Sequence, residues 1–165
     1  MASLIGGIQL RLRELLLASM LPVATSWVTR QQRRILARGL PLNLDQLADA
    51  GALGIENPER VRVLYVARVP LPSEGLVRAT RFLTGAVPGP TAGLAAGYGV
   101  FIDATRRHDR RLLAHELAHV RQYERSGGIR PFLREYLQAC FVHGYANANF
   151  ELEARNAAQK LTQAA

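Results

Sequence analysis

The sequence predicts a mostly helical α+β fold in which a short twisted sheet packs against one central helix. Helical periodicity and capping signals recur along most of the chain, whereas two segments, 61–69 and 98–103, have the composition of strands. The segment 110–126 contains neither glycine nor proline and predicts the central helix. These observations favour helices packed around a small sheet.

The amino-terminal region predicts an amphipathic helix. Its apolar residues recur at helical spacing and form one stripe: Ile5, Ile8, Leu12 and Leu15. We expect this helix to pack on its own domain, and peripheral contact with a membrane or with a partner protein is the alternative. The apolar run 15–23 is too short, and too soon interrupted by Pro22, to span a bilayer. Glu14 and the long preceding segment suit a signal peptide poorly. We therefore expect a cytoplasmic protein, with secretion by a non-classical route as the alternative.

Two further helices are expected before the first strand. The second helix should run from Thr25 or Ser26 to Arg38, since glycine follows at 39 and proline at 41. A short third helix should follow, with Asn43 as its cap, and should end near Gly51.

The clearest strand comes after the turn at Asn57-Pro58. One of its faces is apolar and consists of Val61, Val63, Tyr65, Ala67 and Val69. Prolines at 70 and 72 end it. We then expect a helix at 73–83, a loop at 85–93 and a second strand at 98–103. The glycine-rich segment 93–99 leads into that strand, where glycines permit close backbone approach or mark a bulge.

The segment His115-Glu116-Leu117-Ala118-His119 is the most informative about function. On a helix its two imidazoles lie about 40° apart around the axis and one turn apart along it. Both could therefore bind one zinc ion, and Glu116 could hold and deprotonate a water on that ion. Asp109 suits the N-cap of this helix, and Gly127-Gly128 supplies a stop signal. The alternative is an ordinary amphipathic helix with two hydrogen-bonded histidines.

A catalytic zinc site usually has three protein ligands and a water. The downstream candidates are Glu124, Glu135, His143, Glu151 and Glu153. Glu124 lies five residues after His119, which rotates it away from the metal-facing stripe. Glu151 or Glu153 fits better, because a further helix around 131–141 and a turn region can return a C-terminal helix to the motif. The two carboxylates are about 200° apart on a helix, so at most one should face the metal.

The run L-L-A-H-E-L-A-H-V-R-Q at 112–122 resembles the gluzincin-type zinc metallopeptidases, particularly the compact DUF4157-like metallopeptidase domains. Those domains are similar in a block of this kind followed later by an E-x-E-A segment, here 151–154. The resemblance implies a zincin-like core over 60–158, Zn²⁺ bound by His115, His119 and Glu151, and hydrolysis of peptide bonds.

One position departs from the family pattern. Arg155 stands where the family has an aspartate that orients a zinc-binding histidine. Another acceptor must therefore fix that imidazole. The resemblance covers about 93–158 and says little about the first ninety residues.

Peptide hydrolysis also needs a donor aimed at the developing oxyanion. His143 and Tyr145 come shortly before the expected third ligand, and Tyr123 follows the motif. We expect Glu116 as the general base, with His143 and Tyr145 as further catalytic residues. For His143, a surface or hydrogen-bonded histidine is the alternative.

Composition limits the remaining function classes. The 165 residues suit one domain over 1–165, with an N-terminal helical region at 1–40. Apolar and charged fractions of 48% and 21% are those of a globular protein. The net charge of +8 comes from scattered arginines without a nucleic-acid-binding signature, so no nucleic-acid partner is expected. Cys140 is the sole cysteine, which excludes thiolate zinc clusters and favours a buried structural thiol.

The sequence leaves two functions open. The first is a zinc-dependent metallopeptidase that acts on a peptide or protein substrate. The second is a catalytically inactive zinc-binding module with a role in protein assembly, targeting or toxin delivery. Substitution of Glu116 by Gln distinguishes them, because only a peptidase should lose its function while the metal stays bound.

Overall fold

A computed structural model of the chain describes residues 2–72 and 91–163. Most of these residues are helical, and they include one four-stranded mixed sheet, so the predicted fold class is confirmed. In chain order the elements are α1 (Ala2–Arg38), β1 (Leu40–Pro41), α2 (Leu44–Ala52), β2 (Arg62–Val66), β3 (Gly93–Ala96), β4 (Gly99–Asp103), α4 (Arg110–Arg125), α5 (Ile129–His143) and α6 (Asn149–Gln163). Short 3₁₀ helices connect some of them: η1 (Pro58–Arg60), η2 (Ala104–Arg106) and η3 (Tyr145–Asn147). The predicted helix at 73–83 and most of the predicted loop at 85–93 lie outside the described residues.

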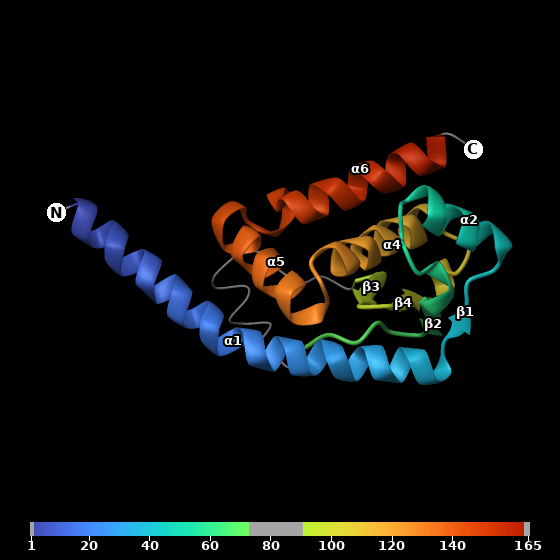
Figure 1. Cartoon of the computed structure of the whole chain (residues 1–165), viewed down its shortest axis with the longest axis horizontal. Coiled ribbons are helices and arrows are strands. Elements are labelled where there is room, and N and C mark those ends of the chain that lie inside the picture. Colours follow the sequence, from blue (N-terminus) through green and yellow to red (C-terminus); the bar gives the residue numbers. More distant parts are fainter. Residues whose placement is uncertain (1, 73–90, 164–165) are drawn as a thin grey trace.

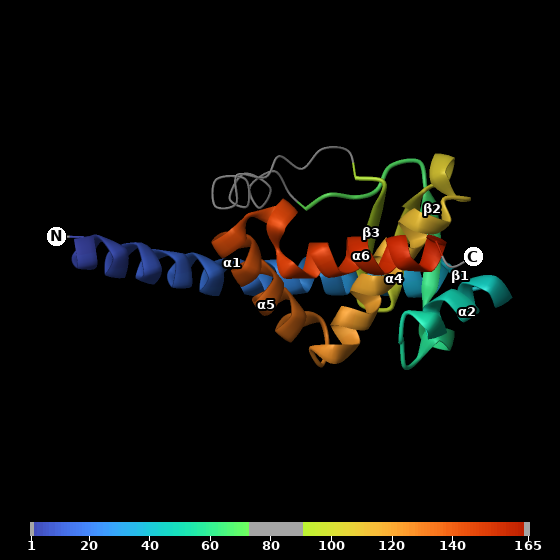
Figure 2. The ribbon, with the colours of Figure 1, turned by 90° about the horizontal axis from the view of Figure 1, so that it is seen from above.

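The described elements are arranged in layers (Figure 1). α1 runs along one face of the sheet, α4 packs on the opposite face against β3 and β4, and α6 packs along α4. α5 follows α4, contacts α1 and leads to α6 through η3. The amino-terminal part of α1 extends beyond the rest of the described chain, as Figure 2 shows from above. Helices lie on both faces of the sheet because successive strand residues point to opposite faces, and both faces here are apolar.

The prediction of two separate helices before residue 39 is wrong, because α1 continues through Pro22. A proline inside a helix removes one hydrogen bond to the carbonyl four residues earlier. That carbonyl belongs to Ala18, and both Ala18 and Pro22 are exposed, so water can bind it. Packing against the domain keeps the helix intact along one side, where the buried residues are Met20, Leu21, Ala24, Val28 and Ile35.

The sheet has the strand order β1-β2-β4-β3. β2 pairs with β4 in parallel, and β3 pairs with β4 in antiparallel orientation. The strand predicted at 61–69 is confirmed over Arg62–Val66 and ends three residues earlier than predicted, and the strand at 98–103 is confirmed almost entirely. β3 was not predicted, because its small residues lack the β-branched and aromatic signal of a strand. Gly97 has a φ of +59° at the first position of the two-residue turn to β4, as a type II′ hairpin requires.

The ends of α4 and the start of α2 are formed by the residues that the sequence indicates. The Asp109 side chain accepts a hydrogen bond from the Leu112 N–H and caps α4. Gly127 and Gly128 have positive φ angles and end the helix. Asn43 begins α2 through a capping box. Both ends of α4 are therefore fixed, and this fixes where its side chains lie relative to the sheet.

The core lies on both sides of β4. Val100 and Ile102 point towards α4, where Leu117 and Val120 are also buried. Phe101 points the other way and is fully buried beneath α1. Within the part of the chain that the structure describes, no helix combines the length and the apolar character that crossing a membrane requires.

Candidate metal centre

α4 places His115 and His119 on one face, one turn apart. Their Nε2 atoms are 3.2 Å apart, and the two rings are nearly perpendicular. Helical spacing accounts for the closeness, since residues four apart lie on the same stripe. His119 is buried, and the side chain of His115 is 21% exposed. The pair therefore lies at the edge of the core, where one ring remains accessible from solvent.

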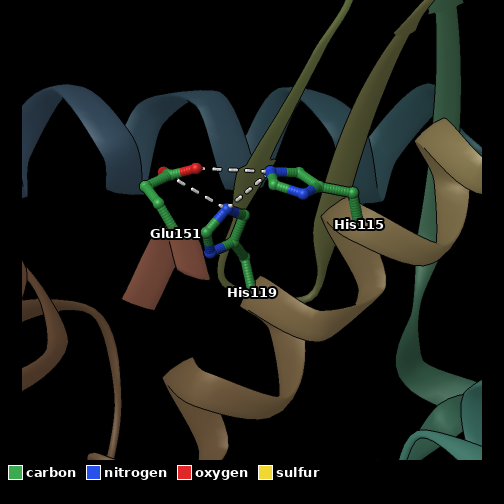
Figure 3. Close-up of side chains that lie close together, drawn as sticks. All are labelled: His115, His119 and Glu151. Carbon is green, nitrogen blue, oxygen red and sulfur yellow. Dashed lines mark hydrogen bonds and ion pairs between the residues drawn. The ribbon is translucent and has the colours of Figure 1, made fainter. Parts of the chain in front are cut away.

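α6 brings Glu151 to the two histidines. α5 and η3 reverse the chain, and α6 then packs along α4, so that the first turn of α6 lies beside the motif. The Glu151 Oε2 atom is 3.4 Å from Nε2 of His115, and its Oε1 atom is 3.5 Å from Nε2 of His119. Figure 3 shows the carboxylate and both imidazoles pointing towards one another.

The three side chains could bind one metal ion. Each offers one ligand atom, and these atoms all lie within 4.8 Å of one another. Two imidazole nitrogens facing each other at hydrogen-bonding distance next to a carboxylate form a set of donors that a shared cation stabilises. The donors also match a known type of catalytic site, which consists of two histidines and a glutamate. The three residues therefore fit a bound metal ion.

Gln122 orients one of the imidazoles. Its Oε1 atom lies 2.8 Å from Nδ1 of His119, and its amide nitrogen donates to the carbonyl of Phe150 at 3.0 Å. Because the amide nitrogen is committed to Phe150, Oε1 must accept, and His119 must carry its proton on Nδ1. The Nε2 lone pair is then free for a metal. Gln122 is fully buried and is the acceptor that the departure at Arg155 required.

Tyr136 orients the carboxylate. Its hydroxyl, on α5, donates to Oε1 of Glu151 at 2.7 Å. Burial raises the pKa of Glu151, but hydrogen bonds from His115 and Tyr136 and the charge of His119 outweigh this and lower it to about 2. The carboxylate therefore stays ionised near neutral pH, as a metal ligand must.

The two histidines have opposite pKa shifts. Burial lowers the pKa of His115, but the hydrogen bond to Glu151 and the charges of Glu116 and Glu151 outweigh it, so the net shift is upward. Burial lowers the pKa of His119, and the opposing charge of Glu151 does not compensate. His119 is thus the ring that favours the neutral form, in which a histidine can ligate a metal.

Glu116 lies beside the three candidate ligands. It lines a cavity of about 100 Å³ together with His115, His119 and Glu151. Its side chain is buried, and burial, supported by the charge of Glu151, raises its pKa to about 7 despite the opposing effects of His115 and the Ala95 backbone. A carboxyl group of this kind can take up and release a proton near neutral pH.

The candidate donors are placed differently. Tyr145, on η3, lines the same cavity and is 46% exposed. Tyr123 also lines it, and its hydroxyl donates to the Ala95 carbonyl at 3.4 Å. His143 is exposed at the end of α5 and is not among the residues that line the cavity. Among these three residues, the structure thus brings Tyr123 and Tyr145 to the cavity of the candidate metal centre and leaves His143 outside it.

The other carboxylates considered as ligands have partners of their own. Arg125 forms a bidentate pair with Glu153, with both distances at 2.9 Å, and Arg121 lies 3.5 Å from the same carboxylate. Glu124 points to η1 and the β3–β4 turn, where its carboxylate accepts hydrogen bonds. The choice between Glu151 and Glu153, which helical spacing alone left open, is thereby resolved in favour of Glu151.

Sequence reasoning missed Gln122, Tyr136 and the strand behind Glu116. Gln122 could have been found, because three residues after His119 is the same face of the helix. Tyr136 has no comparable signal, since only the return of α5 brings it to Glu151. Arg155 donates to the carbonyl of Ala146 in η3 and so ties α6 to the turn that places Tyr145.

Comparison with protein-family models, curated proteins and solved structures gives no significant match. The geometry of the described residues is therefore the basis on which a function can be assigned.

Proposed function

We propose that this protein is a zinc-dependent metallopeptidase of the gluzincin type, which hydrolyses peptide bonds in a peptide or protein substrate. The observation that supports this function best is the position of Glu116. A buried carboxyl group with a pKa of about 7 lines the same cavity as His115, His119 and Glu151. A purely structural metal site needs no such group, whereas hydrolysis by an activated water needs a base beside the metal.

Zinc is the ion that the donor set suits best. Ligand bonds of about 2.0–2.1 Å in a tetrahedral arrangement place donor atoms roughly 3.3 Å apart. The two imidazole nitrogens are 3.2 Å apart, and each lies 3.4 or 3.5 Å from a different oxygen of the Glu151 carboxylate, so small side-chain adjustments would suit this spacing. When bound, zinc would lower the pKa of a water and polarise the scissile carbonyl. His115, His119 and Glu151 would hold it, and a fourth position would remain for water or substrate.

The remaining chemistry belongs to side chains of this chain. Glu116 would accept a proton from the attacking water and then pass it to the departing amine nitrogen. Its burial supports this role, because a carboxyl group with a raised pKa can perform both transfers near neutral pH. Gln122 and Tyr136 would keep His119 and Glu151 in the orientation that the metal requires.

Tyr145 would donate a hydrogen bond to the oxyanion that forms at the carbonyl. It is partly exposed at the cavity, so it could meet a substrate entering from solvent. We expect Tyr145→Phe to lower kcat while KM changes little, because the donor would act mainly in the transition state. His143→Ala serves as the comparison, and an equal loss of kcat in that variant would contradict the assignment of Tyr145.

The test of the function is a pair of variants at the motif. Elemental analysis of the purified protein should find about one zinc per chain, and His115→Ala should lose it. Glu116→Gln should keep the zinc and lose hydrolysis of a mixed peptide library, read by mass spectrometry. Zinc bound in the wild type without any cleavage would contradict the peptidase proposal.

The size of the cavity favours a second candidate function. Sites for small organic ligands typically enclose about 300–1,000 Å³, whereas this cavity measures about 100 Å³. A zinc-binding module without catalysis would need no larger space. In that case Glu116→Gln would leave both the metal and the function of the protein unchanged.

A further inference from the structure

β3 places a glycine opposite the candidate base. Gly93 pairs with Ile102 of β4 and is buried. Gly93 is the first residue of the edge strand β3, and glycine in a strand weakens it, because the residue loses more conformational freedom on folding and has no side chain to pack. Gly93 is not among the glycines with positive φ, so the backbone conformation does not call for glycine. The presence of glycine at position 93 must therefore be explained by a contact with a neighbouring residue.

The contact is with Glu116. A Cβ atom added at position 93 would lie 2.6 Å from Oε1, 2.8 Å from Cγ and 2.9 Å from Cδ of that side chain. All three distances are shorter than the non-bonded contacts that a Cβ atom makes in proteins. The carboxylate and its stem therefore lie directly on the backbone of β3, in the space that any other residue would fill.

Glu116 has room to move aside only towards the cavity that it lines with the candidate ligands. Its side chain is buried, and the backbone of Ala95, two residues along β3, lies close to its carboxylate. The close contact includes Cγ near the root of the side chain, so rotation of the carboxylate alone would not relieve it. A methyl group at position 93 would push the whole side chain away from the strand.

We infer that Gly93 is a positioning residue, whose missing side chain lets β3 seat Glu116 beside the candidate metal ligands. This inference rests on the proposed function for its catalytic consequence, whereas the contact itself does not depend on it. The edge strand β3 would thus contribute to the chemistry through Gly93, which lines the same cavity and positions the base.

Gly99 offers a matched control. It lies in β4 and points to the opposite face of the sheet, where a Cβ atom would lie 2.8 Å from both Cβ and Cδ1 of Ile35 on α1. Gly99→Ala would therefore crowd the core to a similar degree without touching Glu116. The two glycine variants separate general crowding from displacement of the base.

The first experiment is a double-mutant cycle on stability. Thermal or urea unfolding would be measured for wild type, Gly93→Ala, Glu116→Ala and the double variant of the full chain, all with metal removed by a chelator. Gly93→Ala should destabilise the wild type, and the cost should largely vanish in the Glu116→Ala background, because that variant removes the atoms that clash. Effects of alanine on the unfolded chain cancel in the cycle. Equal costs in both backgrounds would overturn the inference.

The second experiment uses peptide hydrolysis and zinc content. Gly93→Ala should keep its zinc and lower kcat on the order of 100-fold with little change in KM, as a displaced catalytic group would. Gly99→Ala should keep kcat per folded molecule close to the wild-type value. Unchanged kcat in Gly93→Ala would also overturn the inference. If the wild type cleaves no peptide, the proposed function fails, and the stability cycle alone decides whether Gly93 seats Glu116.

Discussion

Gln122 links the candidate metal centre to the start of α6 through two hydrogen bonds. It holds His119 through Oε1 and the Phe150 carbonyl through its amide nitrogen. Phe150 directly precedes Glu151, so one amide group sets the positions of two ligands that belong to different helices.

We expect Gln122→Ala to weaken zinc binding roughly 10–100-fold, as loss of a hydrogen-bonding partner of a ligating histidine commonly does. Competition titration with a zinc-sensitive chelating dye measures the change. Gln159→Ala, an exposed residue of α6, is the control and should bind zinc as the wild type does. A Gln122→Ala variant of wild-type affinity would show that His119 needs no acceptor.

The two neighbouring glutamates should respond in opposite ways. Glu151→Gln should abolish stoichiometric zinc binding, because the variant lacks the charged ligand. Glu153→Gln should keep the zinc and change the free energy of unfolding by about 1 kcal/mol or less, because it breaks a partly exposed ion pair with Arg125. Elemental analysis and urea denaturation of both variants give the comparison. Loss of zinc in the Glu153 variant would reverse the assignment.

For single residues, the sequence predicted the candidate ligands better than their surroundings. His115 and His119 follow from helical spacing. The returning helix left Glu151 and Glu153 open, and the family resemblance favoured Glu151. The partners Gln122 and Tyr136 depend on side-chain rotamers and on how α5 returns, which spacing along the chain does not define.

Among the elements, α4 is tied to the loops beside the sheet by Glu124. Its carboxylate accepts hydrogen bonds from the backbone of Glu56 and Asn57 and from the hydroxyl of Tyr98, at 2.8–3.0 Å. Burial raises the pKa of Glu124, but these hydrogen bonds outweigh it and lower the pKa below its usual 4.5. The central helix is thus connected to η1 and to the β3–β4 turn at the end opposite its N-cap.

This pKa shift predicts a pH dependence of stability. A carboxyl group with a lowered folded-state pKa contributes stability that is fully present above its usual pKa of 4.5 and is lost as the pH falls through the lowered value. The wild type should therefore exceed Glu124→Gln in free energy of unfolding at pH 7, and the difference should shrink below pH 4.5. Urea denaturation across this range measures it. Glu59→Gln, an exposed carboxyl on η1, is the control, and a difference independent of pH would contradict the prediction.

The errors at the scale of elements have physical causes. Pro22 suggested a break, but burial of Leu21, Ala24 and Val28 on one side keeps α1 continuous. β3 was not predicted because its residues are small and lack the β-branched and aromatic character of a strand. The small residues allow close packing against α4. From Leu17 onwards α1 packs on the domain, whereas Leu15 is 68% exposed, so the expected packing of the stripe formed by Ile5, Ile8, Leu12 and Leu15 is not found at Leu15. Membrane or partner contact by the residues before Leu17 stays a prediction.

For the whole molecule, a bound metal would join α4 and α6, which are separated along the chain by α5. Zinc should therefore stabilise the folded state, by about 2.7 kcal/mol at a free concentration of one hundred times its Kd. Thermal unfolding with zinc and with excess chelator should show a higher Tm for the first. His115→Ala should unfold at the same temperature in both, and a zinc response in that variant would contradict the site.

The mostly helical α+β class was predictable because the 3.6-residue period is strong in segments as long as α4. The layer order was not, since it depends on the parallel pairing of β2 with β4, two strands more than thirty residues apart. Membership of the gluzincin-type metallopeptidases, which the sequence resemblance implies, stays a proposal.

The two-residue turn Gly97-Tyr98 determines which residue of β3 lies against Glu116. It sets the register that pairs Gly93 with Ile102, and the Tyr98 N–H is held by Gln32 of α1 at 3.0 Å. Because strand side chains alternate, a slip of one position would turn Gly93 away and bring a bulkier neighbour under Glu116. Insertion of one amino acid into the Gly97-Tyr98 turn would therefore displace Glu116, the proposed base. Every proposed metal ligand would stay in place.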